Sequence, residues 1–63
     1  MEWKDWIGKA IFVKLKSGSV YSGTVEEVSD MGNNLVFISI IDKYGKWVTF
    51  TTSEIIKIVE EGR

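Results

Sequence analysis

The chain has 63 residues, of which 44% are apolar and 27% are charged, and its eight basic and nine acidic side chains give a formal net charge of −1. These numbers predict one domain over residues 1–63, no membrane span and, by default, a cytoplasmic location; they disfavour a protein that coats duplex nucleic acid by neutralising phosphates. Because cysteine and histidine are absent, the sequence lacks thiolate and imidazole metal ligands and the commonest general base, so we expect no enzyme activity, no cofactor and no metal site.

The N-terminal segment, residues 1–7, predicts a short amphipathic helix. Trp3, Trp6 and Ile7 stand at helical spacing among charged residues, and Gly8 follows as a stop signal. We expect the apolar side of this helix to cover the core. The alternative is an exposed tryptophan stripe that binds a partner.

The next segment predicts a β-hairpin. The inward-facing apolar residues of its first strand, residues 9–16, recur with a period of two: Ile11, Val13 and Leu15. A Ser-Gly-Ser turn leads into a second strand over residues 19–28, and Gly23 inside this strand indicates a bend or a close backbone approach. The apolar phase moves from odd positions at Val25 to even positions at Val28, which predicts a bulge near Glu26 and Glu27.

The following segment, residues 29–34, is rich in residues that favour turns and tolerate left-handed backbone geometry. Its plain interpretation is a hairpin turn in which Asp30 and Asn33 hydrogen-bond to their own backbone.

Three further strands complete the chain. The third, residues 35–41, is apolar except for Ser39, so we expect both of its faces to be covered, one by the core and the other by another subunit. A turn over residues 42–46 precedes the fourth strand, residues 47–52, which alternates between apolar and mixed faces. The fifth, residues 55–59, is apolar on both faces and is followed by a polar tail, residues 60–63.

Five short strands after one helix, within residues 9–59, predict an all-β protein, a strongly bent antiparallel SH3-like open barrel. The last two strands are the expected edges, and the fifth has only Lys57 to discourage pairing with another chain. Head-to-tail pairing of the fourth strand with a neighbour's fifth strand closes a ring when the rotation permits. The predicted subunit interface comprises Trp47, Val48, Thr49, Phe50, Ile55, Ile56 and Ile58.

The apolar and glycine spacing of residues 8–18 and 21–25, together with the ending Ile55-Ile56-Lys57-Ile58, resembles the two sequence motifs of the Sm and Sm-like proteins. The resemblance extends over nearly the whole chain. It implies an Sm-like fold and a homo-oligomeric ring of six or seven subunits that pair strand four with the neighbour's strand five.

The resemblance also implies binding of single-stranded RNA, often uridine-rich, in pockets around the pore of the ring. It places Asp30 at the family's aspartate and Asn34 at its asparagine. Gly32 stands at the position of the stacking side chain, Asn33 replaces the usual methionine, and Thr51-Thr52 replaces arginine-glycine. The RNA-binding residues that it implies, with Met31 as a substitute apolar platform, are Asp30, Met31, Asn33, Asn34, Thr51 and Thr52.

Two functions remain open. One is a ring that binds single-stranded RNA, weakly or in a modified pocket, and it is the first choice because of the family resemblance. The other is an oligomeric scaffold or protein-interaction module that has lost the uridine pocket, and the missing stacking and arginine side chains favour it, because base stacking is worth roughly 1–3 kcal/mol.

Overall fold

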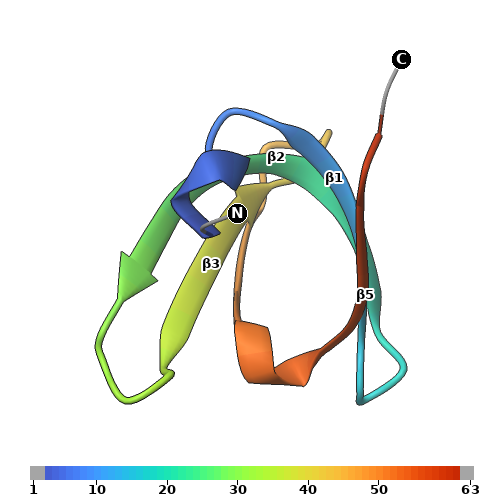
Figure 1. Ribbon diagram of the computed structural model, residues 1–63. Coiled ribbons are helices and arrows are strands. Elements are labelled where there is room, and N and C mark those ends of the chain that lie inside the picture. The colour runs from blue at the N-terminus through green and yellow to red at the C-terminus, as the bar shows by residue number, and fades with distance from the viewer. Residues whose placement is uncertain (1–2, 62–63) are drawn as a thin grey trace.

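The computed structural model describes residues 3–61 and shows an all-β protein, with five antiparallel strands in one unclosed sheet (Figure 1). The sheet order is β4-β3-β2-β1-β5, so β4 and β5 are the two edges, as the sequence predicted. No helix within residues 3–61 has the length and apolar character that a membrane span requires. The strands are β1 (Ala10–Leu15), β2 (Val20–Asp30), β3 (Val36–Ile41), β4 (Trp47–Thr51) and β5 (Ile55–Glu60), and the two short helices are η1 (Trp3–Trp6) and η2 (Thr52–Glu54).

The N-terminal helix is shorter than predicted. It is a single 3-10 turn, Trp3–Trp6, in place of an amphipathic helix over residues 1–7, of which residues 1–2 lie outside the described part of the chain. Gly8 ends the segment with a φ of +87°, a conformation that glycine adopts without steric cost. Trp3 and Trp6 are half-buried and pack against the core, so this turn covers the core as expected.

The core is a single cluster of nine buried apolar side chains, and no polar or charged residue of the described chain is buried with them. The apolar residues expected to face inward on the first two strands belong to it, except Tyr21, which is half-buried and packs against the cluster. Only one face of β3 is buried within the single chain; the face that carries Phe37, Ser39 and Ile41 is half-buried, so cover of this face by another subunit stays a prediction. The cluster comprises Ile11, Val13, Leu15, Val25, Val28, Val36, Ile38, Ile40 and Phe50.

β2 is strongly bent (Figure 1) and extends two residues beyond the predicted strand end, to Asp30. A Cβ atom on Gly23 would lie only 2.5 Å from the carbonyl oxygen of Ile41, so glycine permits the close approach of β2 to the end of β3. The β2–β3 register shifts between Val25 and Glu27, which leaves Glu26 as the extra residue of a bulge. The sequence predicted both the close approach and the bulge.

Both edge strands leave apolar side chains uncovered. On β4, Phe50 is buried, whereas Trp47 is 58% exposed. On β5, Ile55 and Ile58 pack against the core, whereas Ile56 is 60% exposed. The β1–β5 register shifts between Lys14 and Leu15 on β1. This shift allows Ile55 and Ile58 both to face the core while Ile56, between them, faces away. β5 also runs one residue further than predicted, because Glu60 pairs with Ile11 and is not part of a polar tail.

Candidate nucleic-acid interface

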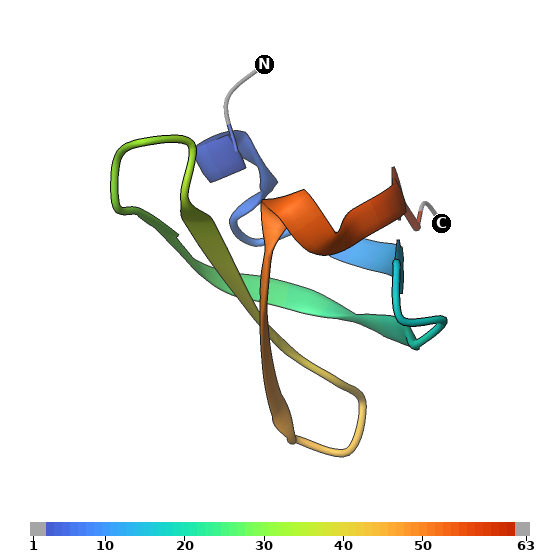
Figure 2. The same cartoon turned by 90° about the horizontal axis from the view of Figure 1, so that it is seen from below.

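A hollow of about 550 Å³ lies where the loop after β2 meets the N-terminal turn and the start of η2. Figure 2 draws the N-terminal turn and this loop on the same side of the molecule, and Figure 1 shows the turn above the loop. We call it the loop hollow, and its lining residues come from four separate segments of the chain: Trp3, Asp30, Gly32, Asn33, Asn34, Val36 and Thr52.

The backbone of this loop has an unusual conformation. Gly32, Asn33 and Asn34 have φ values of +82°, +55° and +64°, three consecutive residues in the left-handed region. Glycine and asparagine enter this region at the lowest cost, whereas a β-branched residue is a genuine outlier there. The loop closes through hydrogen bonds from the Met31 amide to the Leu35 carbonyl, at 2.8 Å, and from the Leu35 amide to the Gly32 carbonyl, at 2.9 Å. The local sequence thus fixes the loop shape.

Asp30 anchors the start of the loop, because its Oδ1 atom accepts a hydrogen bond from the Gly32 amide at 2.9 Å. The plain hairpin interpretation predicted this bond for Asp30 and a similar one for Asn33. Within residues 3–61, the side-chain amides of Asn33 and Asn34 form no hydrogen bond, so the second part of that prediction is wrong. Each amide therefore keeps two donor hydrogens and one acceptor oxygen for a ligand.

The structure places four of the six residues that the family resemblance implies around the loop hollow: Asp30, Asn33, Asn34 and Thr52. The other two lie elsewhere. Met31 is 62% exposed and its Sδ atom accepts a hydrogen bond from the Ser29 hydroxyl at 3.5 Å, so it provides no platform in the hollow. The Thr51 hydroxyl lies 3.0 Å from that of Ser53, in hydrogen-bond contact with it.

Trp3 and Val36 line the same hollow, although neither is among the residues implied to bind RNA; the sequence indicated Trp3 only as core cover or as part of a partner-binding stripe. Trp3 was expected to cover the core, which it does with part of its surface. The position of Trp3 at the hollow depends on the pairing of residues 8 and 9 with β2. The Gly8 amide donates to the Val25 carbonyl at 2.8 Å, and the Val25 amide donates to the Lys9 carbonyl at 3.0 Å. No local sequence pattern reports such a contact between distant segments.

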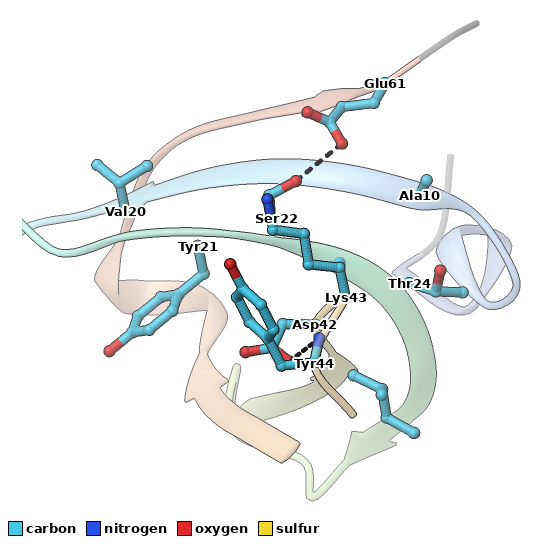
Figure 3. Close-up of a pocket in the computed structure, with 11 residues that line it drawn as sticks. Ala10, Val20, Tyr21, Ser22, Thr24, Asp42, Lys43, Tyr44 and Glu61 are labelled. Atoms are coloured by element: carbon cyan, nitrogen blue, oxygen red, sulfur yellow. Dashed lines mark hydrogen bonds between the residues drawn. The ribbon is translucent and has the colours of Figure 1, made fainter. Parts of the chain in front are cut away.

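A second hollow, of about 500 Å³, lies between β2 and the β3–β4 turn (Figure 3). Tyr21 and Tyr44 contribute its aromatic surface, and the Lys43 Nζ atom lies 5.4 Å from the centroid of the Tyr44 ring. The Ser22 hydroxyl donates to a Glu61 carboxylate oxygen at 2.8 Å on its border. None of the residues expected to bind RNA lines this hollow, so the loop hollow is the better candidate site.

The loop hollow is polar without being strongly charged. Among its described lining residues, Asp30 is the only ionisable one, and no lysine or arginine borders it. The described chain also has no group of three or more acidic, histidine or cysteine side chains arranged to hold a metal ion. The chemistry available in the hollow is therefore hydrogen bonding and aromatic contact.

No family model, no curated protein and no solved structure matches this chain. The functional argument consequently depends on the residues and geometry of the chain itself.

Proposed function

We propose that the chain is a ring-forming Sm-like protein, with an SH3-like barrel fold, that binds single-stranded RNA in the loop hollow. One observation carries this proposal. Residues that the resemblance assigns to RNA binding are separated by about twenty positions in the sequence, at Asp30 to Asn34 and at Thr52, and yet border one hollow.

The side chains of the hollow suit a nucleobase. Two unpaired amides, on Asn33 and Asn34, offer both donors and acceptors to the edge of an unstacked base, which is how proteins read single-stranded RNA. The volume falls within the range of about 300–1,000 Å³ that small-molecule sites occupy. Because none of the described residues that border the hollow is basic, contacts to bases and not to phosphates carry the affinity in this proposal, and we expect a shallow dependence of binding on salt.

The sheet edges support the ring. β4 and β5 each have one unpaired side, and Trp47 and Ile56 are exposed there. Exposed apolar edge strands are templates for pairing with another chain, and one chain that offers β4 on one side and β5 on the other makes the head-to-tail contact that closes rings. In such an assembly, the resemblance implies, the loop hollows surround the pore.

Binding is tested by fluorescence anisotropy of labelled oligouridine and oligoadenosine, titrated with protein at two salt concentrations. We expect one base to be preferred and duplex RNA of the same length to bind more weakly. Absence of binding to both oligonucleotides at protein concentrations of about 100 μM, the upper range of nonspecific nucleic-acid affinity, refutes the RNA-binding function.

The ring is tested separately by native mass spectrometry. We expect one dominant species at a multiple of the 7.2 kDa chain mass. A strictly monomeric spectrum under gentle conditions contradicts the ring.

A scaffold for protein partners is the second candidate. The specific observation in its favour is that Gly32 contributes no side chain at the loop tip and that none of the described residues at the hollow is an arginine. A ring that assembles without binding either oligonucleotide supports this function over RNA binding.

A further inference from the structure

The loop hollow has a single aromatic side chain among its described lining residues, Trp3, and it comes from outside the loop. Trp3 is half-buried and packs against the core, and the same residue borders the hollow. At the loop tip itself there is open space, because a Cβ atom on Gly32 would meet nothing within 4 Å. The hollow therefore combines a vacant loop tip with an aromatic surface supplied by a different element.

The N-terminal turn holds Trp3 in place before any ligand arrives. The Lys9 amide donates to the Trp6 carbonyl at 2.9 Å, and residues 8 and 9 exchange backbone hydrogen bonds with Val25 on β2. The turn is thus tied to the sheet at its C-terminal end and to the core through its side chains. A platform that is ordered in the free protein loses little conformational entropy on binding, which favours stacking.

We propose that Trp3 is the base-stacking residue of the loop hollow, and that its ligand is an unpaired nucleobase stacked on the indole and hydrogen-bonded by the amides of Asn33 and Asn34. This inference rests on the proposed RNA-binding function and adds the residue that gives the site its affinity. The indole offers a π face to any base, whereas the two amides select among bases by their donor and acceptor patterns. A hollow that has both an aromatic residue and asparagine amides with no hydrogen-bond partner among the described residues suits a base better than an apolar peptide side chain, which would leave the amides without partners.

The chain contains a matched control for Trp3. Trp6 belongs to the same turn, is also half-buried and packs against the same core, but does not border the hollow. We expect Trp3→Ala to weaken binding of the preferred oligonucleotide by about 5- to 150-fold, the range that loss of one stacked base produces, whereas Trp6→Ala leaves affinity within about threefold. Trp3→Phe keeps an aromatic face and should retain most of the affinity. If circular dichroism shows that Trp3→Ala is unfolded, the affinity of Trp3→Phe is compared with that of the wild-type protein instead.

Removal of the base provides a second arm. An oligonucleotide with abasic sites in place of the preferred bases should bind the wild-type protein and the Trp3→Ala variant equally, because no base remains to stack. Wild-type binding that is unchanged by Trp3→Ala and lost in Asn34→Gly overturns the stacking role and leaves the RNA-binding function intact. Failure of the wild-type protein to bind any oligonucleotide overturns both.

Fluorescence reports on stacking directly. The sequence has three tryptophans, so a variant with Trp6→Phe and Trp47→Phe keeps Trp3 as the sole indole. We expect its emission to be quenched on addition of oligonucleotide, with the same midpoint as the anisotropy titration. Emission that stays constant while anisotropy reports binding overturns the proposal, and so does a change of Trp3 emission on binding of a leucine-rich peptide with higher affinity than the oligonucleotide.

Discussion

Gly23→Ala is the substitution that most directly tests how the bent sheet is built. The added Cβ would lie 2.5 Å from the Ile41 carbonyl oxygen and 3.1 Å from the Asp42 Cα atom, about 0.9 Å short of ordinary contact at its closest point. Both atoms belong to the backbone and cannot rotate away, so β2 and the end of β3 must separate. Overpacking of this kind costs about 1–3 kcal/mol, and a weakened hydrogen bond of the β2–β3 ladder adds about 1 kcal/mol.

One effect acts in the opposite direction. Alanine lowers the conformational entropy of the unfolded chain, which stabilises the protein by about 0.4–1 kcal/mol where the native backbone accepts alanine. The steric cost exceeds this gain, so we expect a net loss of about 2–3 kcal/mol. That is a large part of the stability of a domain of this size, about 3–9 kcal/mol, and corresponds to a fall in Tm of roughly 10–20 °C.

Thermal unfolding followed by circular dichroism at a fixed protein concentration measures this loss, since the proposed assembly would make Tm depend on concentration. Gly45→Ala is the control, because Gly45 has a φ of +82° and nothing lies within 4 Å of the position of its Cβ. It loses only the backbone preference of glycine, about 1 kcal/mol. A Gly23→Ala variant that melts at or above the wild-type temperature, or no lower than Gly45→Ala, refutes the close-approach argument.

Three further substitutions separate folding, assembly and binding. Asn34→Gly should keep the left-handed backbone and change stability by less than about 1 kcal/mol, yet weaken RNA binding several-fold by anisotropy, whereas equal binding contradicts a ligand role for the amide. Asp42→Ala removes the Oδ1 atom that accepts hydrogen bonds from the Tyr44 and Lys46 amides, both at 2.9 Å. We expect it to lower the free energy of unfolding in urea by about 1–2 kcal/mol. Asp42→Asn keeps an acceptor oxygen and should lower it less. Ile56→Lys should convert the ring to monomers in native mass spectrometry, and a ring that survives it excludes this edge from the interface.

The sheet could be predicted from the sequence because its determinants are local. The alternation in residues 11–15 places each apolar side chain on one face, and a phase change between Val25 and Val28 requires an extra residue, found at Glu26. The N-terminal helix was less predictable, because two tryptophans three positions apart fit a 3-10 turn as well as an α-helix. The apolar run of β3 likewise could not reveal that one of its faces stays half-exposed, since periodicity says nothing of what covers a face.

The loop hollow was predictable only in part. The turn-forming residues identified the loop, and the Asp30 bond to the Gly32 amide follows from the short reach of an aspartate side chain. Trp3 and Thr52 border the same hollow as this loop because of the strand pairing over the whole sheet. No short sequence motif predicts that pairing. The resemblance to the Sm motifs also placed Met31 and Thr51 at the site, but these residues lie outside the hollow, one exposed beside Ser29 and the other bonded to Ser53.

The atoms that give the loop its shape differ from those that we propose for recognition. Its shape comes from the backbone conformations of Gly32, Asn33 and Asn34 and from one carboxylate oxygen of Asp30. The amides of the two asparagines contribute no hydrogen bond to that shape within the described chain. A loop selected only for folding would be served equally well by glycine at both positions, because glycine enters the left-handed region as readily. Variants with glycine in place of Asn33 or Asn34 therefore distinguish a recognition site from a plain turn: a recognition site loses RNA binding while the free energy of unfolding stays constant.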